Sequence, residues 1–284
     1  MMLEINNLTK EFYYEGFKLD NVSFKLEPGY VMGFIGPNGS GKSTTIKLIM
    51  NLLKKDSGEI KIFGKDHIKY EKEIKDRIGF VYDESHFYET FTIEEMKNVI
   101  APFYSKWDDK LFYDYLKDFD LGQKYKIKNL SKGMKMKFAL AIALSHHADL
   151  IIIDEPTSGL DPIFRREILD VLYKIIQDEN KSIFFSTHIT SDLDQIADYI
   201  TYIDKGKIVF SKPMEEIMDT YAIVKGGPEI LNDYNRKELL GYRETKVGFE
   251  GLTDNLEKIK GFFGADIIIE RPTLEDIMYY TKGR

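Results

Sequence analysis

The residues best suited to chemistry lie in a glycine-rich run near the N-terminus. Residues 36–43, GPNGSGKS, fit the pattern G-x-x-x-x-G-K-[ST] at every fixed position, between a predicted strand and a predicted helix. Successive backbone N–H groups can wrap a triphosphate only where side chains stay small, which accounts for the glycines. Lys42 is suited to reach the β- and γ-phosphates, and Ser43 to offer its hydroxyl to Mg²⁺. The predicted phosphate contacts are Asn38, Gly39, Ser40, Gly41, Lys42, Ser43 and Thr44.

A second candidate cluster is a pair of carboxylates at the end of an apolar run. Residues 150–153, LIII, lead directly into Asp154 and Glu155. Magnesium prefers hard oxygen ligands and keeps several waters, so Asp154 at the carboxyl end of a strand is suited to hold one of those waters. Glu155 comes next and points elsewhere, where it is suited to polarise an attacking water.

Hydrophobic periodicity predicts the strands that position these motifs. Apolar residues alternate with polar ones over 19–26, which is typical of a half-buried strand. Buried strands are predicted at 30–35, 150–153 and 182–186. Because strands alternate with helical patterns, the sequence predicts a parallel sheet with crossover connections.

The helical patterns predict an insertion into that sheet. A helix is expected from about Ser43 to Lys54, ended by residues 56–58. The stretch between about residues 87 and 147 is aromatic-rich and helical, and Thr92 begins a capping box. It separates the glycine-rich run from the acidic pair.

The last part of the chain has a different character. Residues 199–210 contain the turn sequence DKGK, which predicts a hairpin. Beyond Pro213 the sequence mixes strand-like runs with a final helix capped by Thr273. We therefore expect a small α+β appendage at the C-terminus.

Composition and charge exclude several classes of protein. The chain has 284 residues, of which 43% are hydrophobic and 31% charged, as in ordinary globular proteins. Its net charge of −7 disfavours a nucleic-acid binder, so nucleic acid is not expected among its partners. Cysteine is absent, which excludes disulfides, thiolate zinc sites and cysteine nucleophiles. No apolar run approaches the length of a membrane span, and no signal segment is expected.

Residues 130–134, LSKGM, connect these motifs to one family. Ser131 is a predicted N-cap for a helix at 134–144, and the N–H groups after it form an anion site. The run resembles the LSGGQ signature of the ATP-binding subunits of ABC transporters, with Leu, Ser and the second Gly kept. The resemblance implies that Ser131, Gly133 and Met134 face the γ-phosphate of ATP held by the other subunit of a head-to-tail dimer.

Two further positions are similar to the same family. Residues 158–161, SGLD, resemble the loop that crosses the dimer interface, and Asp161 with Pro162 is also a typical helix start. His188 follows an apolar strand, as does the family's switch histidine, which contacts the γ-phosphate and holds the attacking water. The resemblance therefore implies that Glu155 and His188 are the catalytic residues.

The residue that stacks on adenine is less clearly marked. Phe12 follows Thr9-Lys10-Glu11 as the stacking aromatic does in the family, and Tyr13 and Tyr14 are alternatives in a shifted register.

The sequence departs from the family pattern at two places. Lys132 and Met134 replace Gly and Gln in the signature, although the backbone donors remain. Asp83 stands near the position of a glutamine that touches magnesium, so the implied metal site is Ser43, Asp83 and Asp154. These departures, and a tail at 271–276, resemble ATPases of bacterial drug, lantibiotic and amphipathic-peptide exporters, including the phenol-soluble-modulin export type.

The patterns and the resemblance together imply an α/β fold. It is a P-loop NTPase with a mostly parallel sheet, an N-terminal antiparallel β subdomain, an inserted helical subdomain and a C-terminal α+β appendage. The expected domains are 1–212, with the helical subdomain at about 87–147, and 213–284.

The implied function is that of a transport motor. Two ATP-binding subunits, as a homodimer or a heterodimer, would sandwich ATP and Mg²⁺ and drive export by a separate transmembrane permease at the cytoplasmic face of the cell membrane. Two alternatives stay open at this point: a soluble ABC ATPase that acts on ribosomes or DNA, and an ATP-binding regulator that does not hydrolyse. One cassette, no heptad run and an acidic balance disfavour the first, and the presence of both Glu155 and His188 disfavours the second.

Overall fold

The N-terminal part of the chain forms an antiparallel sheet. The computed structural model describes residues 1–14, 16–83, 86–178, 180–194, 196–263 and 266–282. This sheet has the order β2-β1-β4-β5. Its strands are β1 (Leu3–Phe12), β2 (Phe17–Leu26), β4 (Ser57–Ile62) and β5 (Lys65–Asp66). Burial alternates along β2 as the sequence predicts, with Leu19, Val22, Phe24 and Leu26 facing the core.

A second sheet carries the glycine-rich run and the acidic pair. Its order is β10-β9-β3-β8-β7-β6, and all neighbours are parallel except the hairpin of β9 and β10. Its strands are β3 (Val31–Ile35), β6 (Ile78–Val81), β7 (Leu150–Asp154), β8 (Ser182–Thr187), β9 (Tyr199–Asp204) and β10 (Lys207–Pro213). Every residue of β3, β7 and β8 is buried, which explains their apolar sequences.

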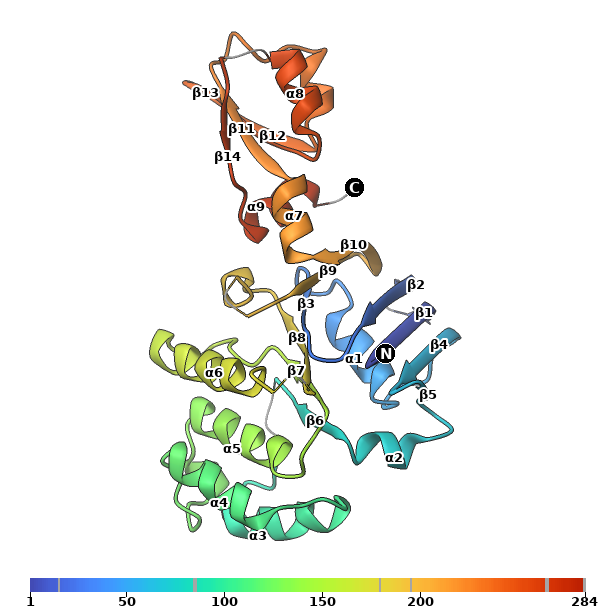
Figure 1. The fold of residues 1–284 in the computed structure, drawn as a ribbon, viewed down its shortest axis with the longest axis vertical. Coiled ribbons are helices and arrows are strands. Elements are labelled where there is room, and N and C mark those ends of the chain that lie inside the picture. Colours follow the sequence, from blue (N-terminus) through green and yellow to red (C-terminus); the bar gives the residue numbers. More distant parts are fainter. Residues whose placement is uncertain (15, 84–85, 179, 195, 264–265, 283–284) are drawn as a thin grey trace.

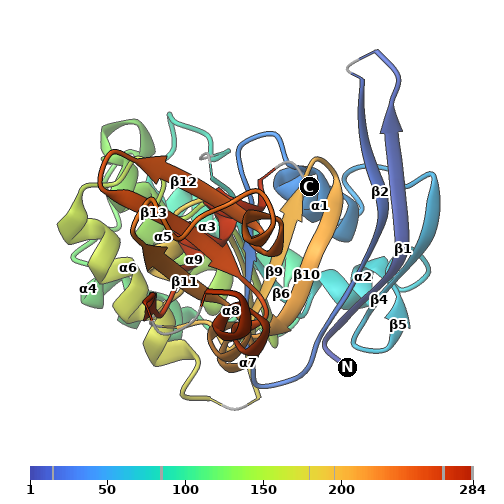
Figure 2. The same cartoon turned by 90° about the horizontal axis from the view of Figure 1, so that it is seen from above.

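Helices lie around this sheet, and those within residues 87–147 form the predicted insertion. They are α1 (Lys42–Ile49), α2 (Glu71–Lys75), α3 (Ile93–Ile100), α4 (Asp109–Asp118), α5 (Lys132–Leu144) and α6 (Pro162–Ile175), with the 3₁₀ turns η1 (Ala101–Phe103), η2 (Ile127–Asn129) and η3 (Thr190–Asp192). Helices α3, α4 and α5 lie together between β6 and β7 in the chain (Figure 1). Figure 2 shows the β1–β2 hairpin on the side of the molecule opposite α4 and α6.

Helix α1 is shorter than the sequence predicts. It ends at Ile49 instead of about Lys54. Asn51 adopts φ of 53°, a left-handed conformation that asparagine tolerates and that ends a helix. Residues 56–58 are therefore not the helix stop: Ser57 and Gly58 begin strand β4, directly after Asp56.

The C-terminal residues form a third, antiparallel sheet with the order β12-β13-β11-β14. Its strands are β11 (Ala222–Gly226), β12 (Gly241–Thr245), β13 (Gly248–Thr253) and β14 (Ile268–Glu270), accompanied by α7 (Met214–Thr220), η4 (Asn235–Glu238), α8 (Leu256–Phe263) and α9 (Leu274–Thr281). Thr273 caps α9 in a capping box with Asp276, as predicted. The division into two domains at about residue 213 stays a prediction. Within the described ranges, every helix is too short or too polar to cross a membrane.

Candidate functional site

The glycine-rich loop leads from the carboxyl end of β3 into α1. Gly41 is the N-cap of α1, with φ of 115°, a conformation that only glycine adopts readily. A Cβ atom there would come within 2.7 Å of Leu19 Cδ2 and 3.1 Å of Phe17 Cζ. The loop therefore packs closely against β2 at the positive end of α1, where an anionic ligand is favoured.

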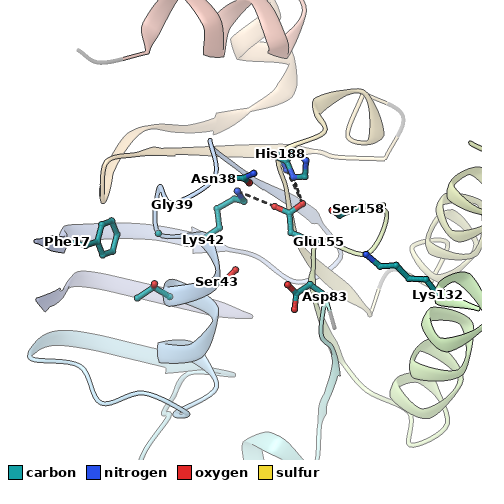
Figure 3. A pocket seen from close by; sticks show the side chains of 12 residues that line it. Phe17, Asn38, Gly39, Lys42, Ser43, Asp83, Lys132, Glu155, Ser158 and His188 are labelled. Carbon is teal, nitrogen blue, oxygen red and sulfur yellow. Dashed lines mark hydrogen bonds and ion pairs between the residues drawn. The ribbon is translucent and has the colours of Figure 1, made fainter. Parts of the chain in front are cut away.

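A cavity of about 610 Å³ opens beside this loop (Figure 3). It brings together side chains from the loop, from the ends of β6, β7 and β8, and from the start of α5. Its lining is Phe17, Asn38, Gly39, Gly41, Lys42, Ser43, Thr44, Asp83, Lys132, Glu155, Ser158 and His188. Nine of the residues predicted from the sequence are in this set. Ser40 is outside it, because its side chain is buried beneath the loop.

Three charged or titratable side chains meet at one end of the cavity. Lys42 Nζ lies 3.2 Å from Glu155 Oε1, and it also donates a hydrogen bond of 2.8 Å to the carbonyl oxygen of Gly36. The other carboxylate oxygen of Glu155, Oε2, lies 2.7 Å from Nδ1 of His188 (Figure 3). Lys42 is only 5% exposed and Glu155 9%, so the ion pair is little screened by water.

The backbone of Glu155 is held in an unusual conformation. Its φ is 48°, in the left-handed region that costs a residue with a side chain about 1–3 kcal/mol. Its N–H donates to the carbonyl oxygen of Ser186 at 3.0 Å, and the backbone N–H of His188 reaches Glu155 Oε2 at 3.3 Å. Hydrogen bonds with Ser186 at the end of β8, and with His188 just beyond it, thus orient the Glu155 carboxylate toward the cavity.

Asp154 and its neighbours have the chemistry of a magnesium site. Burial raises the pKa of Asp154, hydrogen bonds from Ser186 and Ser43 oppose this effect, and the charges of Asp83 and Glu155 raise the pKa further. A divalent cation would offset the repulsion between the buried Asp154 and Glu155 and the exposed Asp83. The hydroxyl and carboxylate oxygens present are the hard ligands that Mg²⁺ prefers, so these residues fit the ion.

The signature residues lie apart from this cavity, except for one. Ser131 caps α5, because its Oγ accepts from Met134 N at 3.2 Å, as predicted. Gly133 is buried against α6, where a Cβ would come within 2.8 Å of the Phe164 ring. Ser131, Gly133 and Met134 are not in the lining of this chain's own cavity, whereas the exposed Lys132 is.

The aromatic residue at the cavity is Phe17 and not Phe12. The two residues are paired in register across the β1–β2 hairpin, with ring centroids 6.2 Å apart, and only Phe17 belongs to the lining. Tyr13 and Tyr14 are exposed and also outside the lining. Sequence reasoning missed Phe17 because the register of the hairpin, which sets its neighbours, is not visible in a motif.

The fold and the site define a P-loop ATPase. A phosphate loop between a buried parallel strand and a helix, with carboxylates at the end of the neighbouring strands, is the arrangement of that class. Comparison with known proteins specifies the class further. Residues 19–158 match the family described as "ABC transporter".

Curated relatives and solved structures agree with this match. The chain is 33% identical to a bacitracin transport ATP-binding protein of Bacillus licheniformis over 76% of this chain and 71% of that protein. It is 33% identical to a lantibiotic transport ATP-binding protein of Streptococcus pyogenes over 74% of this chain and 90% of that protein. The structure of an ATP-binding subunit of an ABC transporter superposes with a TM-score of 0.70 and 27% identity, covering 77% of this chain and 92% of that one.

One solved structure also shows a nucleotide state. A dimeric ATP-binding cassette in a post-hydrolysis state, bound to ADP and Pi, superposes with a TM-score of 0.66 and 26% identity, covering 75% of this chain and 99% of that one. The chain belongs to the ATP-binding proteins of ABC transporters. It is an ATPase of that family.

Proposed function

We propose that this chain is the ATP-hydrolysing motor subunit of a bacterial ABC exporter, with Lys42, Glu155 and His188 at the reacting end of the ATP. The observation that carries the proposal is the cluster of these three side chains in one cavity, with Glu155 between the other two. Lys42 binds the β- and γ-phosphates, Glu155 polarises the attacking water, and His188 contacts the γ-phosphate.

Residues at the other side of the site hold magnesium in this proposal. Ser43, Asp83 and Asp154 supply its oxygen ligands, directly or through water. When bound, the ion neutralises charge on the phosphates. Asp83 is shorter than the glutamine usual in the family and adds a negative charge, so it strengthens the electrostatic preference for a divalent cation.

The active assembly that we propose is a dimer of ATP-binding subunits. Ser131, Gly133 and Met134 would then face the ATP held by the second subunit. Their position outside the lining of their own cavity supports this arrangement, as does the dimeric state of the related cassette bound to ADP and Pi. Phosphoryl transfer depends on positioning more than on covalent chemistry, so closure of the dimer would complete the site.

A separate transmembrane permease is the second proposed partner, which places the chain at the cytoplasmic face of the cell membrane. An apolar cavity of about 670 Å³ between β6, α3 and α5 is suited to receive a helix of that partner. Phe80, Tyr82, Phe87, Met96, Ile100 and Tyr104 contribute to its lining. The docking region that we propose is around residues 83–103, of which residues 84 and 85 lie outside the described residues.

The cargo that we propose is a drug or an amphipathic peptide. Its support is the similarity to proteins named for bacitracin and lantibiotic transport, together with the LSKGM signature and Asp83. No residue described here contacts the cargo in this proposal, because the permease carries it.

The test uses a tagged Glu155→Gln chain, purified from detergent-solubilised membranes of its source with ATP and Mg²⁺ present. The expected result is a polytopic membrane protein in stoichiometric amount. Lys42→Met, which removes the phosphate-binding ammonium, is the matched control and should retain much less of a second ATP-binding subunit. Recovery of ribosomal proteins or nucleic acid without a membrane protein would favour the soluble alternative and end the transport proposal.

A further inference from the structure

Helix α9 connects the C-terminal sheet to the ATPase core. On one side it lies against β12 and β13, and Tyr280 Oη donates a hydrogen bond of 2.7 Å to Glu250 in β13. On the other side it lies against η3, which lies between β8 and β9 in the chain. Figure 1 shows α9 where the C-terminal sheet meets the rest of the molecule. The helix therefore spans a junction between the two parts.

The contact with the ATPase core is apolar and buried. Leu274 and Ile277 of α9 are 0% exposed. They belong to the same continuous cluster of buried side chains as Leu193, which directly follows η3 and is also 0% exposed. The small separate cluster of the C-terminal part, by contrast, contains Val224, Leu239, Phe249, Ile259 and Phe263. Thus α9 shares its core with the ATPase and not with that small cluster.

The turn that α9 contacts lies next to the proposed γ-phosphate sensor. Turn η3 begins at Thr190, two residues after His188. Thr190 is 8% exposed, and the turn to which it belongs lies against α9. A displacement of η3 would move the backbone that carries His188, because only Ile189 separates them.

The polar side chain of Asp192 in η3 is hydrogen-bonded to the loop that follows Glu155. Asp192 is fully buried, and its two carboxylate oxygens accept from Thr157 Oγ1 and Arg165 Nε, each at 2.5 Å. Arg165 Nη2 also donates to Ser191 Oγ at 2.7 Å. Thr157 lies in the loop after Glu155 and directly before Ser158, which lines the cavity. One turn thus connects the positions of His188 and of the loop that follows Glu155.

We propose that α9 positions His188 for ATP hydrolysis by its contact with η3. Leu274 and Ile277 are the positioning residues on the apolar side of this contact. Asp192 supports the same turn by its hydrogen bonds to Thr157 and Arg165. Helix α9, and not the separate small cluster of the C-terminal part, thus supports the position of His188. The proposal rests on the proposed role of His188.

The experiment compares two isoleucine-to-alanine substitutions in the full chain. Ile277→Ala removes a buried side chain at the junction, and Ile259→Ala removes one of equal burial in the separate small cluster. Ile277→Ala should lower kcat about tenfold, since misplacement by about 1 Å can cost 10²-fold, and leave the KM for ATP and the affinity for ADP nearly unchanged. Ile259→Ala should lower thermal stability to a similar degree without this loss of kcat. Ile277→Val, which removes one methyl group, should recover most of the activity.

Two further outcomes decide the interpretation. In a His188→Ala background, Ile277→Ala should have little additional effect on kcat, because both changes act on one group. Equal kcat values for Ile277→Ala and Ile259→Ala, or full additivity with His188→Ala, would overturn the junction proposal. If His188→Ala alone left kcat unchanged, the proposed role of His188 would fail instead. Should Ile277→Ala not fold, Asp192→Asn tests the same junction from its polar side and should also lower kcat selectively.

Discussion

Lys42 Nζ and Glu155 Oε1 lie 3.2 Å apart, at the end of the cavity where the phosphates are expected. The same ammonium also donates to the carbonyl oxygens of Gly36 and Pro37, so a γ-phosphate would compete with Glu155 for this cation. Binding of ATP should therefore draw Lys42 away from Glu155 and leave the carboxylate, still beside His188, free to meet water. We therefore expect the ion pair to be present before ATP binds and to be replaced when it does.

Glu155→Gln should abolish turnover while keeping ATP bound. We expect kcat to fall by about 10²–10⁴-fold, the usual contribution of a general base, and ATP affinity to rise because the competing negative charge is gone. Phosphate release and equilibrium binding of ATP measure the two effects. Glu167→Gln, at an exposed carboxylate paired with Lys137, is the control and should change neither. An unchanged rate in Glu155→Gln would contradict the catalytic assignment.

Lys42→Met should weaken ATP binding. Charge-assisted hydrogen bonds contribute about 1.5–3 kcal/mol, which corresponds to a rise in Kd of roughly 10–150-fold. AMP, which lacks the β- and γ-phosphates, should bind about as well as before. Lys47→Met, on the exposed side of the same helix, provides the comparison. Equal losses for ATP and AMP would mean that the variant has damaged the site as a whole.

Phe17→Ala should weaken ATP binding more than Phe12→Ala. Stacking of a base on an aromatic side chain contributes about 1–3 kcal/mol, or roughly 5–150-fold in Kd. Only Phe17 lines the cavity, although the two rings are neighbours. Titration of both variants with ATP and with inorganic triphosphate, which has no base, separates stacking from phosphate binding. The opposite ranking would identify Phe12 as the stacking residue, as the family resemblance implies.

Asp154→Asn should raise the Mg²⁺ concentration required for hydrolysis. Loss of a group that holds a metal-bound water typically reduces metal affinity by about 10–100-fold. Activity measured against Mg²⁺ at saturating ATP gives the half-saturating concentration. Asp149→Asn, at the other end of the same strand and paired with Arg77, should leave that concentration unchanged. A lower kcat with an unaltered Mg²⁺ requirement would exclude Asp154 from the metal site.

Two buried histidines should make the fold less stable in mild acid. Burial lowers the pKa of His67 and of His146 below the ordinary value of 6.5, and it outweighs their contacts with carbonyl oxygens, which act in the opposite direction. Below pH 6.5 the unfolded chain therefore binds protons that the folded chain does not, so the free energy of unfolding decreases as pH falls. The slope is at most about 1.4 kcal/mol per pH unit for each histidine. Urea unfolding at several pH values measures it.

The matched variants for this effect are His146→Gln and His147→Gln. The first removes a buried imidazole and should flatten the dependence of unfolding free energy on pH between about 5.5 and 7. The second changes a half-exposed neighbouring histidine and controls for the loss of an imidazole at this place in the chain. A steeper loss of stability toward alkaline pH in the unmodified chain would contradict the sign of this prediction.

Local sequence determined the parts of this protein that depend on neighbouring residues. The phosphate loop at 36–43, the N-caps at Thr92, Ser131 and Thr273, and the buried strands were predicted because each depends on the spacing of residues along one segment. The end of α1 was predicted wrongly. The left-handed conformation of Asn51 ended the helix there, whereas sequence reasoning gave that role to residues 56–58.

Tertiary structure decided the contacts between segments that are distant in sequence. The register of β1 and β2 places Phe17 at the cavity and Phe12 beside it, and the packing of α5 brings Lys132 to the same cavity. The closure of α9 on η3 joins residues about eighty positions apart. Apolar burial drives such contacts without directional preference, so a pattern along the chain indicates that a face will be buried but not which partner will cover it.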